Sequence, residues 1–262
     1  MSSKKPTADL PSSMPSLLIP TLLALIPTQE PETPEDFKNS HLLVSTEWVA
    51  ENSSSDGVIC VDVRDESDYE EGHLPGAIHL PRAATLSTVG PGSMLASAED
   101  LVSLLGKSGI SSDDHLVLYD SGFDTAAARV FWTLEVLGHS KVSVVDGGIP
   151  KWEAEGRPTS KTPTKLEVVE YPAPRALHAG RLTTKKELLE CLGDEDVVLI
   201  DVRSDGEVAG GRVPGAVHVG WTKNFRTIEV DGEEITVFLE PGRLRELYAG
   251  AGVRPDIRLH MY

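Results

Sequence analysis

Short apolar runs alternate with amphipathic segments along most of the chain. Residues 58–63 form a run rich in β-branched residues, which is typical of a strand buried on both faces of a parallel sheet. Similar runs predict strands at 77–80, 116–119 and 142–145. The apolar spacing predicts helices over 97–105, with a capping serine, and 126–137, closed by Gly138. Strands that alternate with helices predict an α/β fold, a parallel sheet with helices on both faces.

The same plan occurs twice. Residues 62–64 (DVR) and 72–79 (GHLPGAIH) recur as 201–203 (DVR) and 211–218 (GRVPGAVH), at an offset of 201 − 62 = 139. A second match aligns 109–119 with 252–262, at 252 − 109 = 143. Each half therefore carries the same ordered pair of elements, and two domains are expected. In the second half the pattern predicts strands at 197–202, 216–219 and 258–262 and helices over 185–192 and 243–249.

Composition shifts divide the chain into four parts. Residues 1–40 are rich in Pro, Ser and Thr and are interpreted as a disordered tail. The first domain is assigned to 41–156, a proline-rich linker to 157–176, and the second domain to 177–262. Nothing in the second half corresponds to residues 126–152, so we expect that domain to be incomplete, with exposed apolar edges and marginal stability.

Charge and cysteine usage limit the partners and the compartment. The net charge of −17 argues against nucleic acid and against an anionic membrane, which both require a basic face. Two isolated cysteines, Cys60 and Cys191, form no disulfide framework, so a reducing compartment is expected, the cytoplasm or the mitochondrion. The apolar stretch 17–26 is interrupted by Pro20 and is too short to span a bilayer, although a targeting role stays open.

Several ordered motifs identify a family. They are 62–64 with 72–77, 90–95, 117–120 leading to 127–129 and Trp132, and 146–148 with Trp152 and Gly156. With these motifs, residues 42–262 resemble a tandem rhodanese-like protein of the thiosulfate and 3-mercaptopyruvate sulfurtransferase family. The resemblance implies two rhodanese-like domains, of which the second is catalytic and the first is its degenerate copy.

The resemblance also implies the chemistry. The family nucleophile is a cysteine directly after the strand that matches 258–262, in a loop that leads into a helix. The helix N-terminus and backbone N–H groups stabilise its thiolate. Sulfur passes from a small anionic donor to this cysteine, and from the persulfide to cyanide or a thiol, by a ping-pong route. The position would follow Tyr262, so we assign no catalytic residue to this chain and expect it to be inactive.

Asp120 occupies the corresponding position in the first domain, a degenerate site. A carboxylate is a poor nucleophile for sulfane sulfur and repels thiosulfate, so this domain is expected to be inert. Cys60 lies inside an apolar strand, where a thiol packs as a small hydrophobe with a raised pKa. Cys191 lies late in a predicted helix, not at its N-terminus, and neither thiol is assigned a catalytic role.

Two arginines are tentative substrate-binding residues. Arg203 follows a strand at the carboxyl edge of the sheet, where α/β folds bind ligands. An ion pair with Asp201 explains it equally well, because Arg64 repeats the motif in the inert domain. Arg212 is interpreted first as a loop residue whose charge could assist an anion, and Arg129 as a helix arginine paired with a carboxylate. No metal site and no cofactor are expected, because no metal-ligand spacing or phosphate loop occurs.

Two other functions stay open. One is a binding or regulatory module, which requires only a stable unit over 41–156. The other is a relative of the dual-specificity phosphatases, which share the fold with a longer loop between cysteine and arginine. The tandem arrangement argues against a phosphatase, and the sequence holds no Cys-x5-Arg. The oligomeric state is not indicated.

Overall fold

The computed structural model describes residues 39–89, 94–174 and 177–262. These lie within one unit, Glu32–Tyr262. The apolar stretch 17–26, almost all of the predicted tail and residues 90–93 of the family motif lie outside the described residues.

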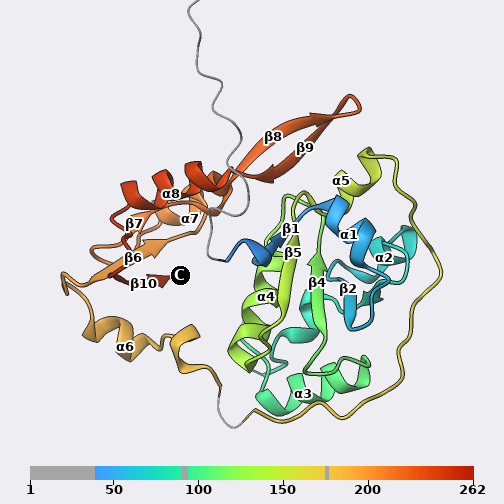
Figure 1. Cartoon of the computed structure of the whole chain (residues 1–262). Helices are drawn as coiled ribbons and strands as arrows, with labels where there is room; N and C mark the ends of the chain where they lie inside the picture. The colour runs from blue at the N-terminus through green and yellow to red at the C-terminus, as the bar shows by residue number, and fades with distance from the viewer. Residues whose placement is uncertain (1–38, 90–93, 175–176) are drawn as a thin grey trace, which may run out of the picture. The chain divides into compact units, whose positions relative to one another are not determined.

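The first half forms one parallel sheet (Figure 1). Its strands are β1 (Leu43–Val44), β2 (Val58–Asp62), β3 (Ile78–His79), β4 (His115–Tyr119) and β5 (Val142–Val145). The order is β1-β5-β4-β2-β3, and every pairing is parallel. The predicted α/β class is confirmed, because β-branched runs buried on both sides suit a sheet that helices cover.

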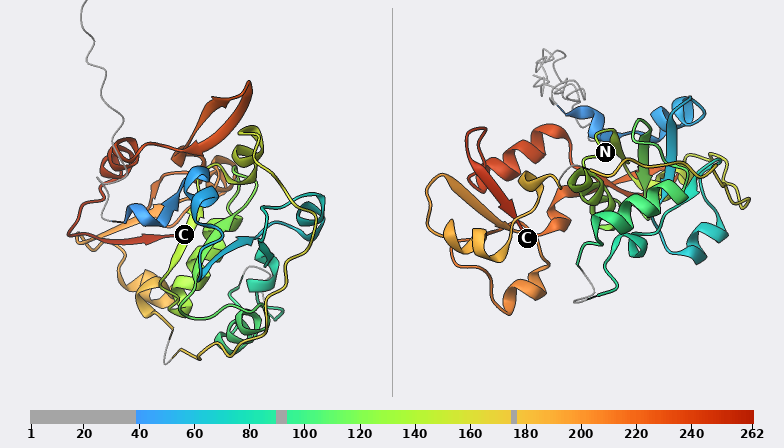
Figure 2. Two further views of the ribbon diagram at one scale, coloured as in Figure 1. Left: turned by 45° about the vertical axis from the view of Figure 1, so that its right-hand side comes forward. Right: turned by 90° about the horizontal axis from the view of Figure 1, so that it is seen from below.

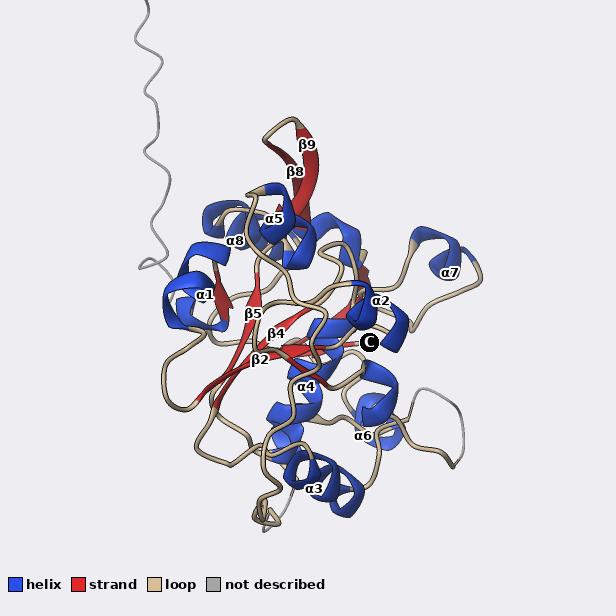
Figure 3. Cartoon of the chain, turned by 90° about the vertical axis from the view of Figure 1, so that its right-hand side faces the viewer, coloured by secondary structure: helices blue, strands red, loops and turns tan. Residues whose placement is uncertain are grey.

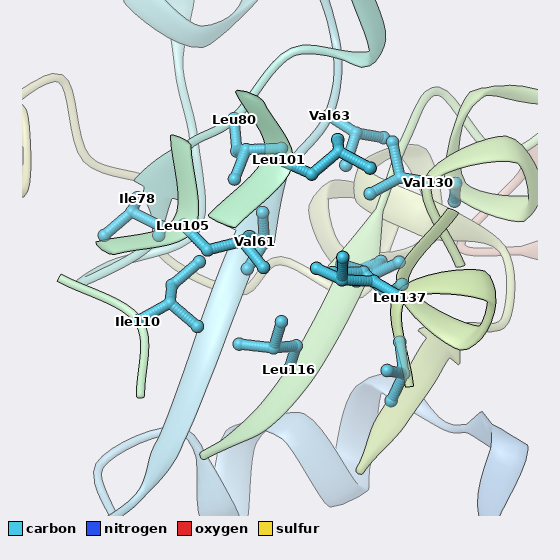
Figure 4. Packing of buried hydrophobic residues seen from close by; sticks show 14 of the residues in the cluster. Val61, Val63, Ile78, Leu80, Leu101, Leu105, Ile110, Leu116, Val130 and Leu137 are labelled. Carbon is cyan, nitrogen blue, oxygen red and sulfur yellow. The ribbon is translucent and has the colours of Figure 1, made fainter. Parts of the chain in front are cut away.

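Helices cover both faces of this sheet. They are α1 (Thr46–Asn52), α2 (Glu66–Glu71), α3 (Ala98–Lys107), α4 (Ala126–Leu137) and α5 (Gly148–Ala154). Successive strand residues point to opposite faces, so Val61 and Leu118 pack with α3 and α4, whereas Cys60 and Val117 pack with α1 and α5. Figure 3 shows these two pairs of helices on opposite sides of the sheet. Figure 4 shows the α3–α4 side, where Leu101, Leu105 and Val130 meet the strands.

The capping residues explain where two helices begin and end. The Ser97 hydroxyl accepts a hydrogen bond from the N–H of Asp100 (3.1 Å), as predicted for the start of α3. Gly138 has φ +91° and ends α4 in the left-handed conformation. Short 3-10 turns lie at Ser40–Leu42, Arg82–Thr85, Ala179–Arg181 and Trp221–Asn224.

The second half repeats part of this plan. β6 (Val197–Asp201) pairs in parallel with β7 (Val217–His218) and β10 (Arg258–Met261). The helices are α6 (Lys185–Glu190), α7 (Asp205–Ala209) and α8 (Pro241–Gly250). Arg258 pairs with Val197 as His115 pairs with Val58, so the register of the second sheet copies that of the first residue by residue.

The two halves differ in how β10 and its counterpart β4 are covered. Leu116 and Leu118 in β4 are 1% and 0% exposed beneath α4, whereas the matching Leu259 and Met261 are 37% and 49% exposed. In the described part of the second half, the sheet has three strands, and β10 forms its edge. Two apolar residues of this edge strand, Leu259 and Met261, are therefore exposed, as predicted, whereas the incompleteness of the second domain stays a prediction.

A β-hairpin lies where no element was predicted. It consists of β8 (Phe225–Val230) and β9 (Glu233–Phe238), joined by Asp231 and Gly232 with φ +48° and +88°. An Asp-Gly pair at positive φ suits a tight hairpin turn, and alternating residues such as Ile235 and Val237 are buried. The sequence analysis left 220–242 without an element, and that omission was wrong.

The predicted linker packs along the first half. Residues 161–174 form no helix or strand, consistent with their proline content. The N–H of Val169 donates to the carbonyl of Gly106 (3.0 Å), Ser160 pairs with His73, and the buried Tyr171 hydroxyl lies 2.8 Å from Nδ1 of His139. The segment thus makes specific contacts with the first half. Its exact boundaries stay a prediction.

Candidate functional site

At the carboxyl edge of each sheet, an Asp, an Arg and a Tyr form the same network. In the second half, Arg203 donates from Nη2 to Asp201 Oδ2 (2.6 Å), from Nε to Asp201 Oδ1 (2.9 Å) and from Nη2 to the carbonyl of Gly211 (2.9 Å). The Tyr262 hydroxyl accepts a hydrogen bond from the N–H of Val213 (2.8 Å), and Arg203 lies over its ring at 5.5 Å. This network braces the turn after β6 against β10.

The first half contains the same network. Arg64 Nη2 lies 2.6 Å from Asp62 Oδ2 and 2.6 Å from the carbonyl of Gly72. The Tyr119 hydroxyl accepts from the N–H of Leu74 (3.1 Å). Because the same geometry occurs in both halves, we infer that the main role of this network is to stabilise the fold.

The two predicted substrate-binding arginines lie in different settings. The hydrogen bond between Arg203 and Asp201 raises the pKa of Arg203 and lowers the pKa of Asp201 to about 2, so both groups are charged. Arg203 is 33% exposed, which leaves part of its side chain accessible. Arg212 lies exposed in the loop between α7 and β7. Their roles in substrate binding stay predictions.

Asp120 follows β4 and fills the loop that leads into α4. Its Oδ1 accepts a hydrogen bond from the N–H of Gly122 and its Oδ2 from the N–H of Ala127, both at 2.9 Å. The carboxyl group is buried, and burial raises its pKa, although the two N–H groups act in the opposite direction. The protein's own carboxylate thus uses the N–H groups that could hold an anion.

The loop after β5 is locked to the Asp120 loop. The Asp120 carbonyl accepts a hydrogen bond from the N–H of Ile149 (3.0 Å). A Cβ atom on Gly148, which has φ +57°, would lie 2.4 Å from that carbonyl oxygen. Only glycine allows this approach, so the Asp146-Gly147-Gly148 motif holds the two loops together.

Neither thiol lies in such a loop. Cys60 is 3% exposed inside β2, and burial raises its pKa to about 12. Cys191 is buried directly after α6, where it packs with Leu199 and Ala216, and its thiol donates to the carbonyl of Leu188 (3.2 Å). Both cysteines therefore lie where the sequence places them, in a strand interior and at the end of a helix.

A cavity of about 1190 Å³ lies elsewhere, along β10, α6 and α4. Arg129, Trp132, Cys191 and His260 are among its lining residues, whereas Asp120, Arg203 and Arg212 are not. The guanidinium of Arg129 lies 4.7 Å from the centre of the Trp132 ring, and burial lowers the pKa of Arg129. The sequence analysis paired Arg129 with a carboxylate and did not anticipate this ring contact.

The described ranges contain neither a cluster of metal ligands nor a helix that could cross a membrane. Over 39–89, 94–174 and 177–262, no three or more His, Cys, Asp or Glu side chains gather as metal ligands would. Across those same ranges, no helix combines the length and the apolar character needed to cross a membrane.

The sequence analysis missed an aromatic cluster beside the Asp120 loop. The ring centre of Phe123 lies 4.9 Å from that of Trp221 and 5.6 Å from that of Phe225, which in turn lies 4.6 Å from that of Phe238. The sequence offers one sign of this cluster: Phe123 is an apolar aromatic residue within the otherwise polar and glycine-containing segment 120–125.

Known proteins resemble this chain in sequence. The model of the rhodanese-like domain family matches residues 45–155 and 184–245. A protein of Saccharopolyspora erythraea, named provisionally as a thiosulfate sulfurtransferase, is 31% identical over 237 residues, which cover 84% of this chain and 80% of the relative. The thiosulfate sulfurtransferase of Corynebacterium glutamicum is 27% identical over 244 residues, 84% of this chain and 80% of the relative.

Solved structures resemble it as well. The 3-mercaptopyruvate sulfurtransferase SseA of Escherichia coli has a TM-score of 0.71 at 25% identity, over 84% of this chain and 87% of that one. The anaerobic ergothioneine biosynthesis enzyme of Chlorobium limicola has a TM-score of 0.70 at 25% identity, over 86% of this chain and 61% of that one. The repeated edge network, the parallel sheets and these matches agree, and the chain belongs to the rhodanese-like domain family.

Proposed function

We propose that the chain is a sulfurtransferase homologue and that its 262 residues by themselves do not transfer sulfur. The family reaction moves sulfane sulfur from thiosulfate or 3-mercaptopyruvate to a thiol or cyanide through a cysteine persulfide. The relatives' names support the reaction class. The placement of the two thiols supports the lack of turnover.

One observation carries the proposal: Asp120 fills the loop after β4, at the position that corresponds, by the family resemblance, to the nucleophilic cysteine of the catalytic repeat. Its carboxylate uses the N–H groups of Gly122 and Ala127. A carboxylate does not attack sulfane sulfur, and its charge repels an anionic donor. Neither cysteine lies in such a loop, because Cys60 belongs to the interior of β2 and Cys191 directly follows α6.

The steady-state cyanolysis assay tests this. Purified polypeptide with thiosulfate, or with 3-mercaptopyruvate, and cyanide is expected to form thiocyanate no faster than the uncatalysed control. The Corynebacterium glutamicum relative is the positive control. Catalysed thiocyanate formation that disappears in Cys60→Ser or Cys191→Ser would overturn the proposal.

A second candidate is a non-catalytic binding module built on the first half. It is favoured by the five-stranded sheet of that half and by the filled Asp120 loop. A fragment over 39–174, which keeps the contacts of Tyr171 and Val169, is then expected to unfold in one cooperative transition. A fragment without cooperative unfolding would remove this candidate.

A further inference from the structure

The degenerate loop of the first repeat presents an aromatic ring to the second repeat. Phe123, three residues after Asp120, is 50% exposed. Its ring lies 4.9 Å from Trp221 and 5.6 Å from Phe225, both of which belong to the second half. Distances in this range are those of favourable aromatic pairs.

The neighbouring loop binds the same part of the second repeat. Asp146, directly after β5, accepts a hydrogen bond from the N–H of Phe238 at the end of β9 (2.8 Å). Ala154 of α5 forms a buried cluster with Ile235 and Val237 of β9. The hairpin accordingly lies beside α5 in Figure 1 and in the left view of Figure 2.

These contacts lead to the edge network of the second sheet. The N–H of Trp221 donates to the carbonyl of Val202 (2.8 Å), the residue between Asp201 and Arg203. Phe123 therefore packs against Trp221, and the backbone of Trp221 is hydrogen-bonded to the turn that carries Arg203. The path from Asp120 to that turn passes through Phe123 and Trp221.

We propose that the loop 120–125 of the first repeat, chemically silent as a sulfur site, is a docking element for the second repeat: Asp120 holds the loop as a built-in anion, Phe123 packs against Trp221 and Phe225, and Asp146 binds the end of β9. The inference does not depend on sulfur transfer. In this proposal, the loop 120–125 positions the β8–β9 hairpin and the turn that carries Arg203.

A double-mutant cycle on the full chain tests the ring contact. Phe123→Ala and Trp221→Ala are combined and compared with Phe123→Ala and Trp48→Ala, since Trp48 contacts His115 at the other end of β4. The unfolding constant of the first pair is expected to depart from additivity by about 2- to 10-fold, and the control pair to be additive. Should Trp221→Ala fail to fold, Trp221→Leu replaces it. Additivity in both cycles overturns the proposal.

Proteolysis tests the role of Asp120. Chymotryptic cleavage after Phe123 is measured in the wild type, in Asp120→Ala and in Asp120→Asn, with Asp124→Ala as the matched control from the same loop. Asp120→Ala is expected to raise the cleavage rate about 10-fold or more, on the loss of two charge-assisted bonds, and Asp120→Asn to raise it less. After division by the cleavage rate of a short peptide that carries the same substitution, Asp124→Ala should leave the rate unchanged, because in the described residues its side chain accepts a hydrogen bond from the adjacent N–H of Thr125 and from no other loop residue. Equal rates in Asp120→Ala and Asp124→Ala contradict the proposal.

Discussion

The Asp201 carboxylate accepts two side-chain hydrogen bonds from the Arg203 guanidinium, at 2.6 and 2.9 Å, and a third bond from the Arg203 backbone N–H at 3.1 Å. Asp62 and Arg64 make the same three contacts 139 residues earlier. The pair also occurs in the first half, whose loop holds Asp120. We therefore infer that it stabilises the turn after β2 in the first sheet and the turn after β6 in the second. Any contact of Arg203 with a donor would come in addition to that role.

The ion pair predicts a dependence of stability on acid. The hydrogen bond from Arg203 lowers the pKa of Asp201 from 3.8 to about 2. A depressed carboxyl pKa contributes stability that is present above the unfolded value and is lost as the pH falls through the folded value. The contribution of Asp201 to the free energy of unfolding should therefore disappear between about pH 4 and about pH 2.

Denaturant titrations of the wild type and of Asp201→Asn over this range measure that contribution. The variant should be less stable than the wild type near neutral pH, and the difference should shrink as the solution is acidified. A difference that stays constant with pH would show that the charge of Asp201 does not matter.

The tyrosines of the two networks predict unequal costs of removing a hydroxyl. Tyr119→Phe leaves the buried N–H of Leu74 without its acceptor, which should lower the free energy of unfolding by about 1–3 kcal/mol. Tyr262→Phe removes the acceptor of Val213 at a partly exposed site, where water can replace it, so the loss should be at most about 1 kcal/mol. Urea denaturation compares the two. A larger loss for Tyr262→Phe would contradict this interpretation.

Much of the fold could be predicted from the sequence. The strands β2, β4 and β5 and the helices α3 and α4 follow from buried apolar runs and capping residues, which are local signals, and the elements β6, β7 and β10 follow from the repeated motifs. The hairpin was missed although its Asp231-Gly232 turn is also a local signal, because residues 225–238 lie outside the repeated motifs on which the prediction of the second half rested.

The candidate site was predictable only in part. The position of Asp120 followed from its place after a strand, whereas its two N–H partners depend on the loop's conformation. The contact of Phe123 with Trp221 joins residues 221 − 123 = 98 positions apart and leaves no periodic pattern in the sequence. Long-range contacts between repeats of this kind require the structure.

The lock between the two loops of the first repeat predicts a steric effect. Gly148→Ala would place a Cβ 2.4 Å from the Asp120 carbonyl oxygen, whereas Gly76→Ala, at φ +78°, would meet no atom within 4 Å. Both substitutions carry the strain of positive φ, so their difference isolates the collision. Gly148→Ala should unfold more easily than Gly76→Ala by about 1–3 kcal/mol, measured by thermal and urea denaturation. Equal free energies of unfolding for the two variants would contradict a tight contact between the Asp120 loop and the loop after β5.

The exposure of β10 predicts uneven protection of backbone amides. Leu259 and Met261 are 37% and 49% exposed, whereas Leu116 and Leu118 are buried. Hydrogen exchange should therefore be markedly faster for the amides that β10 donates to β6 than for those that β4 donates to β2, because local opening is easier where few apolar contacts are lost. Equal protection of the two strands would contradict the marginal stability expected of the second half.

The proposal's central claim is that neither cysteine carries sulfur, because Cys60 is buried inside β2 and Cys191 is buried directly after α6. Intact-protein mass spectrometry after incubation with thiosulfate or 3-mercaptopyruvate tests it most directly. The account predicts no gain of a sulfur atom and no sulfur released by later addition of cyanide. A stoichiometric gain of one sulfur, mapped to Cys60 or Cys191 and removed by cyanide, would contradict it.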